Sequence, residues 1–261
     1  MRLEFYRLAE DIIRLAGNKP VIYVSNDGNW GDALIHAGTL AFFRHFNIKY
    51  KELPVSYSAL QRNLMLLKAK LNGQLIVLAG GGAWCGHYGQ MARASKNMVE
   101  RYNFNNFLVL PSSYDKTYNI KGIIFYCRDQ FESQKNMPTA KFCHDMAFFL
   151  EPLQCNTEPT KGIANSFRVD IESGGEITLP HDNYDLSSKG RHDDDIYGFF
   201  QYISQFSVIN TDRLHVSIGA SLLGKEVNLY EGSYFKNNAI FKTSLKNSYP
   251  STKFISAEGR K

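Results

Sequence analysis

One stretch near the N-terminus decides the fold: Val21-Ile22-Tyr23-Val24-Ser25-Asn26-Asp27-Gly28-Asn29-Trp30-Gly31-Asp32. Its first four residues are β-branched or aromatic and favour a buried strand. The next eight are mostly short polar residues and glycines, which predict a turn. From Asp32 onward apolar residues recur at helical spacing as far as Phe46, so a helix is predicted directly after the turn.

The same order of apolar run, turn and helical segment repeats through the first 150 residues. Further strands are predicted over 75–79, 107–110 and 122–127. Strands that alternate with helices indicate a mostly parallel sheet covered on both faces. The pattern breaks at the prolines and polar residues of 151–162 and then resumes. We therefore predict two Rossmann-like lobes: 1–152, a smaller one over 160–246, and a polar tail over 247–261.

Composition excludes several classes of protein. With 44% hydrophobic residues in 261, the chain can bury a sizeable core, and its net charge of +5 comes from scattered Lys and Arg rather than a dense stripe. No nucleic-acid partner is therefore expected. No leader sequence and no apolar run of bilayer length stand out, so we expect a reduced cytoplasmic protein, with its cysteines buried. Work at the inner face of a membrane stays open.

Ligands of open parallel sheets bind beyond the carboxyl ends of the strands, so polar residues at strand ends are candidates. The first turn places glycines and free N–H groups at a helix start, where anions bind. Its alternative role is a helix cap in which Asn29 or Asp32 satisfies backbone donors. Gly80-Gly81-Gly82 follows a strand in the same way, and a tight turn explains it as well as a ligand does. The segment Cys85-Gly86-His87 offers no convincing metal-ligand set.

The sharpest cluster is Thr211-Asp212-Arg213-Leu214-His215, which follows a predicted strand and opens a helix. The planar guanidinium of Arg213 suits a carboxylate or phosphate, and His215 suits proton transfer near neutral pH. The alternative is a structural Asp212–Arg213 ion pair with a packed histidine. Three more cations, Arg128, Arg168 and Lys236, also follow strands or precede a helix; each is either a solvated surface charge or part of an anion pocket.

Taken together, these segments resemble the polysaccharide pyruvyl transferase family. The matching segments run from Asn26 to about Leu245: Asn29-Trp30-Gly31-Asp32, Gly80-Gly81-Gly82, Leu110-Pro111-Ser112-Ser113, Arg128-Asp129 with Ser133, Asp145, Thr211 to His215 with Leu223-Gly224-Lys225, and Gly232 to Asn237. The resemblance implies a glycosyltransferase-B-like pair of lobes with the active site in the cleft between them. It also implies phosphoenolpyruvate as donor and a sugar hydroxyl pair as acceptor.

The resemblance assigns residue roles as well. Arginines and the histidine of the family's Arg-Leu-His motif bind the donor and act in catalysis, and they match Arg128, Arg213 and His215. We expect His215 to be the general acid/base and Asp32 the second choice. The expected catalytic residues are His215, Arg213 and Asp32, and the expected donor-binding residues are Arg128, Arg168, Lys236, Asn29, Gly81, Gly82 and Ser112.

The predicted reaction transfers pyruvate from phosphoenolpyruvate to a glycan, as oligosaccharide, polysaccharide or lipid-linked sugar, and forms a pyruvate ketal without metal or cofactor. Two alternatives stay open: a glycosyltransferase that uses a nucleotide-sugar, and a non-catalytic sugar- or anion-binding protein. The polar stretch 170–191 reads as a mobile surface loop that matches no motif. That loop and the aromatic residues Trp30, Trp84 and Tyr88 are candidates for acceptor contact, although core packing explains the aromatics equally well.

Overall fold

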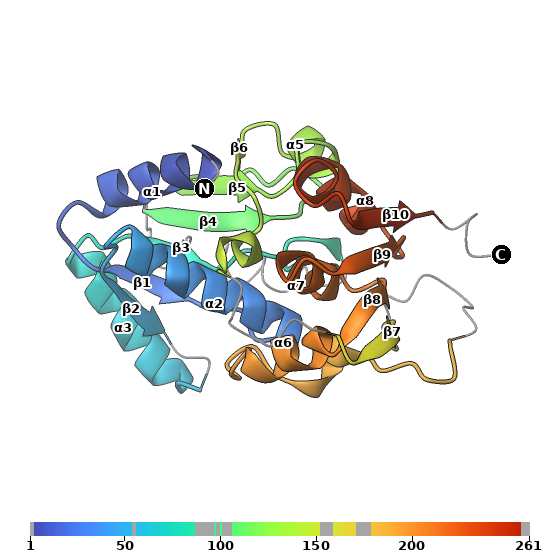
Figure 1. The fold of residues 1–261 in the computed structure, drawn as a ribbon. Helices are drawn as coiled ribbons and strands as arrows, with labels where there is room; N and C mark the ends of the chain where they lie inside the picture. Colours follow the sequence, from blue (N-terminus) through green and yellow to red (C-terminus); the bar gives the residue numbers. More distant parts are fainter. Residues whose placement is uncertain are drawn as a thin grey trace. The chain divides into compact units, whose positions relative to one another are not determined.

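The chain forms two parallel sheets in a computed structural model that describes residues 3–53, 56–86, 97, 100, 106–151, 159–170 and 179–256 (Figure 1). The strands are β1 (Val21–Val24), β2 (Tyr50–Leu53), β3 (Ile76–Leu78), β4 (Phe107–Ser112), β5 (Ile123–Cys127), β6 (Lys141–Phe142), β7 (Lys161–Ser166), β8 (Phe206–Thr211), β9 (Glu226–Tyr230) and β10 (Thr252–Ile255). The first sheet has the order β2-β1-β3-β4-β5-β6 and the second β10-β9-β8-β7, and every pairing is parallel. The predicted α/β class with two parallel sheets is confirmed.

The helices separate the strands along the chain. They are α1 (Leu3–Ala16), α2 (Trp30–His45), α3 (Ala59–Leu71), α5 (Glu132–Asn136), α6 (Tyr197–Ser204), α7 (Leu214–Leu222) and α8 (Lys236–Ile240), with a π-helical turn over Phe241–Leu245 and 3-10 turns over Met146–Phe149 and Leu186–Lys189. The predicted strand and helix on either side of the first turn are confirmed as β1 and α2.

The chain divides into two compact units. Unit 1 comprises 1–27 and 38–146, and unit 2 comprises 28–37 and 147–261. The predicted division at 152–160 does not follow these units, because 28–37, which holds the second part of the first turn and the start of α2, belongs to unit 2. Sequence order cannot reveal this, since helical periodicity runs through α2 without a break.

In unit 1, every residue of β1, β3 and β4 is buried, as strands covered on both faces should be. The order in which the chain adds strands to the sheet reverses at β1, because β2 pairs on one side of β1 and β3 on the other. The carboxyl ends of β1 and β3 therefore lie at a topological switch point. Helix α1 buries Phe5, Leu8 and Ile12 on one face, as its amphipathic sequence predicts.

A polar contact ties α1 to the far strands of the same unit. The carboxylate of Asp11 accepts hydrogen bonds from Lys141 and from the hydroxyl of Tyr126, at 2.6 Å, and pairs with Arg14 at 2.7 Å. Burial alone raises the pKa of Asp11, but these donors together outweigh it and lower the pKa to about 2.

In unit 2, α7 packs on β9 and α6, and α6 on β8. Negative charge lies at the start of α6, where the Asp195 carboxylate accepts from the N–H of Tyr197 in the first turn of the helix. The predicted polar tail is wrong over Thr252–Ile255, which pairs with β9 as strand β10. A lone short strand carries little sequence signal, and the neighbouring strand supplies its hydrogen bonds.

The predicted mobile loop over 170–191 is also wrong over its described second half. Residues 186–189 form a 3-10 turn, and Asp185, Leu186 and Ser187 are almost completely buried. Residues 171–178 lie outside the described part of the chain.

Three cysteines, Cys85, Cys127 and Cys143, are buried free thiols, as expected, and Cys155 lies outside the described residues. Burial raises the pKa of Cys127 to about 12, which keeps its thiol protonated. Of the helices that the structure describes, none combines the length and apolar character needed to cross a bilayer.

Candidate functional site

The carboxyl edge of the first sheet gathers several of the predicted residues. Asn26 follows β1 and donates from Nδ2 to the carbonyl oxygen of Gly80, which follows β3, at 2.6 Å. This contact spans the switch point of the sheet. Asn26 is buried, and its Oδ1 has no hydrogen-bond partner among the described residues. The bond from Nδ2 thus fixes the orientation of the Asn26 side chain and leaves its Oδ1 able to accept a further hydrogen bond.

The triple glycine has a backbone reason. A Cβ on Gly80 would lie 2.4 Å from the carbonyl oxygen of Pro111, so only glycine fits beside the end of β4. Gly81 has a φ of +111° and donates its N–H to the same carbonyl, and it bridges to Ser112. The tight-turn alternative therefore accounts for Gly80 and Gly81, while donor binding by Gly81, Gly82 and Ser112 stays a prediction.

Arg128 is a buried, paired cation and not a solvated surface charge. Its Nη1 lies 2.7 Å from Oδ2 of Asp145, its Nε donates to Oγ of Ser113 at 2.9 Å, and both charged side chains are 1% exposed. These contacts join the ends of β4, β5 and β6. Such a pair fixes the strand ends firmly, because the loss of either partner leaves the other charge buried and unpaired. The donor-binding role that the resemblance implies for Arg128 stays a prediction, and the geometry observed is that of a structural ion pair.

In unit 2, the turn after β8 is held by side chains from neighbouring strand ends. The Thr211 hydroxyl donates to the carbonyl of Ser166 at 2.6 Å and accepts from the N–H of Arg213. Asp212 accepts from the backbone N–H of Arg168 at 2.8 Å. Asn237 donates to the carbonyl of Asp212 at 2.7 Å. The turn therefore has one defined conformation at the carboxyl edge of the second sheet.

Two arginines at this edge share one carboxylate. Arg168 binds Asp170 through Nε and Nη2, at 2.8 and 3.1 Å, and Arg213 binds Oδ2 of the same aspartate through Nη1 at 2.8 Å. Arg213 is held from behind by Asp185, with Nε and Nη2 at 2.9 and 2.5 Å. The side chains of Arg168, Arg213 and Asp185 are 3–7% exposed, whereas that of Asp170 is 38% exposed. The solvent-facing member of the network is thus a carboxylate clamped by two buried guanidinium groups.

Neither Asp170 nor Asp185 was identified from the sequence. Both lie in the polar stretch that matches no motif, and Asp185 is 28 residues from its partner Arg213. The available signal was that two predicted cations, Arg168 and Arg213, sit at neighbouring strand ends and need a counter-charge to be buried.

His215 and the first turn adjoin each other within unit 2. A Cβ built on Gly31 would lie 2.8 Å from Nδ1 of His215 and 3.0 Å from Oδ1 of Asn29, so the imidazole occupies the space beside this glycine. Asp32 accepts from the N–H of Asn29 at 3.1 Å, and Asn29 accepts from the N–H of Gly31 at 2.8 Å. The helix-cap alternative is therefore correct for both polar residues, and it brings the start of α2 against the histidine.

Lys236 opens α8 and is half-buried, with its ammonium 4.8 Å from the ring centroid of Tyr234. It follows β9, so Arg168, Arg213 and Lys236 come after three adjacent strands of the second sheet. The cations predicted in the second lobe thus share one sheet edge.

Of the aromatic residues proposed for acceptor contact, Trp84 is buried and Trp30 is half-buried. Trp30 stacks edge-on against Phe199, with ring centroids 5.7 Å apart, and covers Gly190. Trp84 is 2% exposed in the core of unit 1. Core packing accounts for Trp84, acceptor contact by Trp30 stays a prediction, and Tyr88 lies outside the described residues.

The part of the chain that the structure describes contains no group of three or more His, Cys, Asp and Glu side chains placed to hold a metal ion. The expected donor is itself an anion, and the groups placed to meet an anion are guanidinium groups.

Comparison with known proteins bears on the fold alone. No family model matches the chain, and no curated protein does so. A solved structure, described as a functionally uncharacterized protein from Klebsiella pneumoniae subsp. pneumoniae NTUH-K2044, is 28% identical, covers 98% of this chain and 100% of its own, and superposes with a TM-score of 0.78. The chain therefore shares its two-sheet α/β architecture with that bacterial protein along nearly its full length.

Proposed function

We propose that this protein transfers a pyruvyl group from phosphoenolpyruvate to a sugar hydroxyl pair, with the anionic donor held at the carboxyl edge of the second sheet. One observation carries the proposal: the Asp170 carboxylate is bound by the buried guanidinium groups of Arg168 and Arg213, and Arg213 lies two residues before His215 in sequence. A carboxylate and a phosphate present oxygens with the same preference for the arginine fork. Phosphoenolpyruvate carries both groups on a three-carbon frame.

The position of these groups also fits the proposal. They follow β7, β8 and β9 at the edge where ligands of parallel sheets bind, and Lys236 adds a further cation there. The resemblance to polysaccharide pyruvyl transferases rests on the same segment, Thr211 to His215. The proposal retains the glycosyltransferase-B-like pairing of lobes that the resemblance implies.

In the proposed reaction, His215 gives a proton to the methylene carbon of the donor. One acceptor hydroxyl bonds to the adjacent carbon and gives up its proton to the base, which restores the proton spent. The second hydroxyl then bonds to the same carbon, and the bond between that carbon and the bridging oxygen of the phosphate breaks. The proton of the second hydroxyl leaves with the phosphate. The product is a cyclic ketal and one phosphate.

Charge develops on the central carbon in this sequence, so fixed groups around it matter more than acid strength alone. Arg168 and Arg213 hold the donor's anionic groups, and Asp32, at the start of α2 beside Gly31, is the second candidate acid/base. A positioned acid or base supplies roughly 10²–10⁴-fold in rate, so His215→Ala should lower turnover by about that factor.

The direct test is mass spectrometry of candidate oligosaccharides incubated with phosphoenolpyruvate, together with an assay of released phosphate. The proposal expects a ketal adduct and stoichiometric phosphate with the parent protein, and loss of both with His215→Ala. The exposed residue His181 supplies the matched control, and His181→Ala should react normally. Normal turnover by His215→Ala would remove that residue from the mechanism. Release of a nucleoside diphosphate from a nucleotide-sugar would instead favour a glycosyltransferase, and glycan binding without turnover would favour a binding protein.

A further inference from the structure

Helix α3 carries an exposed apolar stripe. Four of its leucines are 44–79% exposed: Leu60, Leu64, Leu67 and Leu71. They are spaced by four, three and four residues, so at roughly 100° per residue they lie within about 60° of one another on the helix surface. The residues buried against unit 1, Leu66 and Ala69, lie on the opposite side. An exposed row of leucines on the outer face of a surface helix needs a partner of its own.

The charges on α3 are all of one sign. Its thirteen residues include Arg62, Lys68 and Lys70 and no Asp or Glu. At roughly 100° per residue, Lys68 lies on one side of the leucine stripe and Lys70 on the other. The helix is held in place by a capping box, in which the Ser58 hydroxyl accepts from the N–H of Gln61 and the Gln61 side chain accepts from the N–H of Ser58. The stripe therefore belongs to a stable helix flanked by cations.

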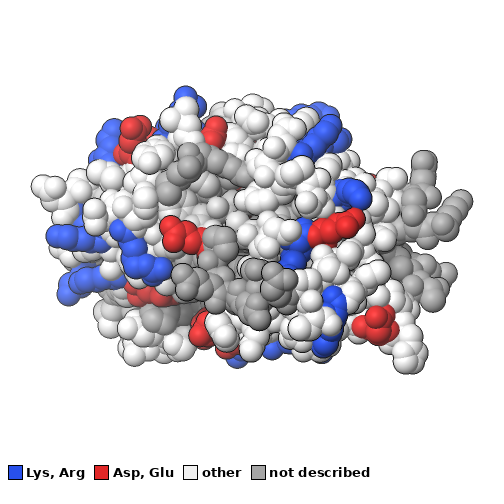
Figure 2. Space-filling view, in the orientation of Figure 1, with Lys and Arg blue, Asp and Glu red and all other residues white. Residues whose placement is uncertain are grey.

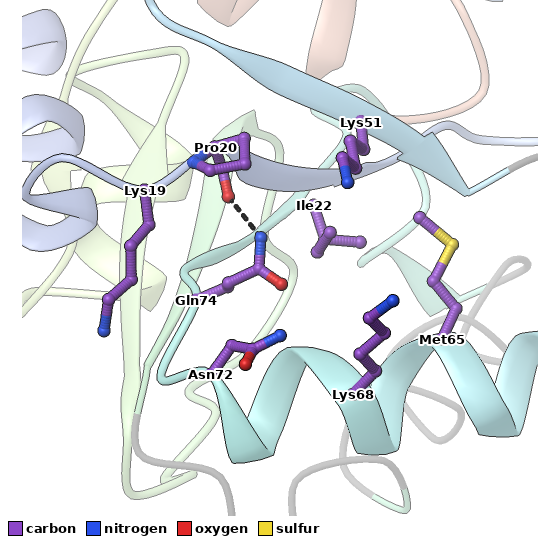
Figure 3. Close-up of a pocket in the computed structure, with 8 residues that line it drawn as sticks. All are labelled: Lys19, Pro20, Ile22, Lys51, Met65, Lys68, Asn72 and Gln74. Carbon is purple, nitrogen blue, oxygen red and sulfur yellow. Dashed lines mark hydrogen bonds between the residues drawn. The ribbon is translucent and has the colours of Figure 1, made fainter.

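A basic pocket adjoins the same helix. Its volume is about 530 Å³, and it lies at the amino end of β1, opposite the carboxyl edge of the first sheet (Figure 3). The ammonium groups of Lys19, Lys51 and Lys68 surround it, over the apolar side chains of Ile22 and Met65. The other lining residues are Pro20, Asn72 and Gln74, with the Gln74 amide donating to the carbonyl of Pro20 at 2.8 Å.

Among the residues that the structure describes, the pocket lining contains no carboxylate and no aromatic ring. Three cations without a counter-charge favour an anion, and the absence of an aromatic ring removes the usual platform for a nucleobase or a sugar face. Lys68 belongs to both the pocket and the border of the stripe, so the two features are continuous. In the space-filling view, Lys and Arg gather over the part of unit 1 that holds β1, β2 and α3 (Figure 2).

We propose that the α3 docking face, made of the leucine stripe, its flanking lysines and the lysine pocket, binds the surface of an anionic phospholipid membrane. The leucines would enter the boundary between headgroups and acyl chains, and the lysines would contact lipid phosphates, as in interfacial amphipathic helices. One phosphate-bearing headgroup fits the lysine pocket. This inference is independent of the proposed function.

The area of the stripe favours a membrane over a second copy of the chain. Four fully exposed leucines offer at most roughly 480 Å² of apolar surface. A standard stable protein interface buries roughly 800 Å² on each partner. A lipid surface needs no such complementary area, and its negative charge matches the lysines on both sides of the stripe.

The test is co-sedimentation of the full chain with vesicles of phosphatidylcholine alone and of equal parts phosphatidylcholine and phosphatidylglycerol. We expect binding to the mixed vesicles only, weakened by added salt. Lys68→Gln with Lys70→Gln should lower the partition coefficient about 30-fold, since each lysine near an anionic surface contributes about fivefold. Leu64→Ser with Leu71→Ser should lower it at least about 30-fold, because the two side chains are 57% and 79% exposed and most of that apolar area is lost.

Matched controls come from the same unit. Leu3→Ser with Ile13→Ser removes two residues of α1 that are 57% and 47% exposed, and Lys116→Gln with Lys121→Gln removes two cations away from α3. Both controls should bind like the parent protein. The proposal is overturned by absence of binding to mixed vesicles, by equal losses in the control variants, or by light scattering that shows a dimer dispersed by the leucine variant.

Discussion

The carboxylate of Asp170 offers the sharpest test of the candidate site, because Asp170→Asn removes the one solvent-facing charge of the arginine network. The substitution deletes the charge-assisted contacts to Arg168, at 2.8 and 3.1 Å, and to Arg213, at 2.8 Å. Asp185 still holds Arg213 from behind. Arg213 therefore keeps its place, while the anion that it shares with Arg168 is lost.

Two effects follow, with opposite consequences for binding. The folded state loses an ion pair whose carboxylate is 38% exposed, so after discounting for solvent screening we expect a stability loss of about 1–2 kcal/mol. A fall of that size lowers Tm by roughly 2–8 °C in a protein of this length. At the same time an incoming anion no longer has to displace the aspartate. If the displacement costs about 1.4 kcal/mol, the Kd for phosphoenolpyruvate falls about tenfold.

The assay combines thermal unfolding with titration calorimetry, with and without phosphoenolpyruvate. Asp170→Asn should unfold at a lower temperature than the parent protein and gain more from the ligand, since stabilisation grows as RT ln(1 + [L]/Kd). The matched control is Asp182→Asn, an exposed aspartate of the same segment whose contact is to Asn165. Weaker or unchanged phosphoenolpyruvate affinity in Asp170→Asn would refute the reasoning that this carboxylate occupies the donor's place.

Three further predictions concern other parts of the molecule. Gly31→Ala places a methyl group 2.8 Å from Nδ1 of His215, so the imidazole must shift. Turnover measured by steady-state kinetics should fall about 100-fold, while the free energy of unfolding falls by no more than about 1–3 kcal/mol. Arg128→Met leaves the Asp145 carboxylate buried without its 2.7 Å partner and should cost about 3–5 kcal/mol in urea unfolding; a stable variant with weakened donor binding would restore the role implied by the resemblance. Asp11→Asn should lower the free energy of unfolding at neutral pH by about 1 kcal/mol. The pKa of Asp11 in the folded protein is lowered to about 2, so this difference from the parent protein should shrink as the pH falls from about 4 to 2. Unfolding curves measured across that pH range check the prediction.

Much of the fold could be predicted from local pattern. The buried strand Val21–Val24, the turn and the helix after it were identified because apolar runs and helical spacing report local structure directly. Two errors have a common cause. Strand β10 and the buried turn at Asp185 lie in mostly polar stretches of sequence, and both are ordered by residues remote in the chain.

The candidate site divides in the same way. The sequence placed Arg168, Arg213, His215 and Lys236 at strand ends, because a strand followed by a cation is visible in one dimension. It did not show that Arg128 is an interior ion pair, since burial depends on what packs over a side chain. Nor did it show which anion the two arginines of unit 2 hold.

The sequence by itself determined the class of the fold and the kinds of side chain that reach the carboxyl edges of its sheets. Strand, turn and helix preferences act over a few residues, so they can be read along the chain. Only the tertiary structure decided the pairings: Arg213 with an aspartate 28 residues away, Gly31 with the imidazole of His215, and Leu60 to Leu71 with solvent. These contacts are set by sheet order and packing, which bring distant residues together and leave no local trace.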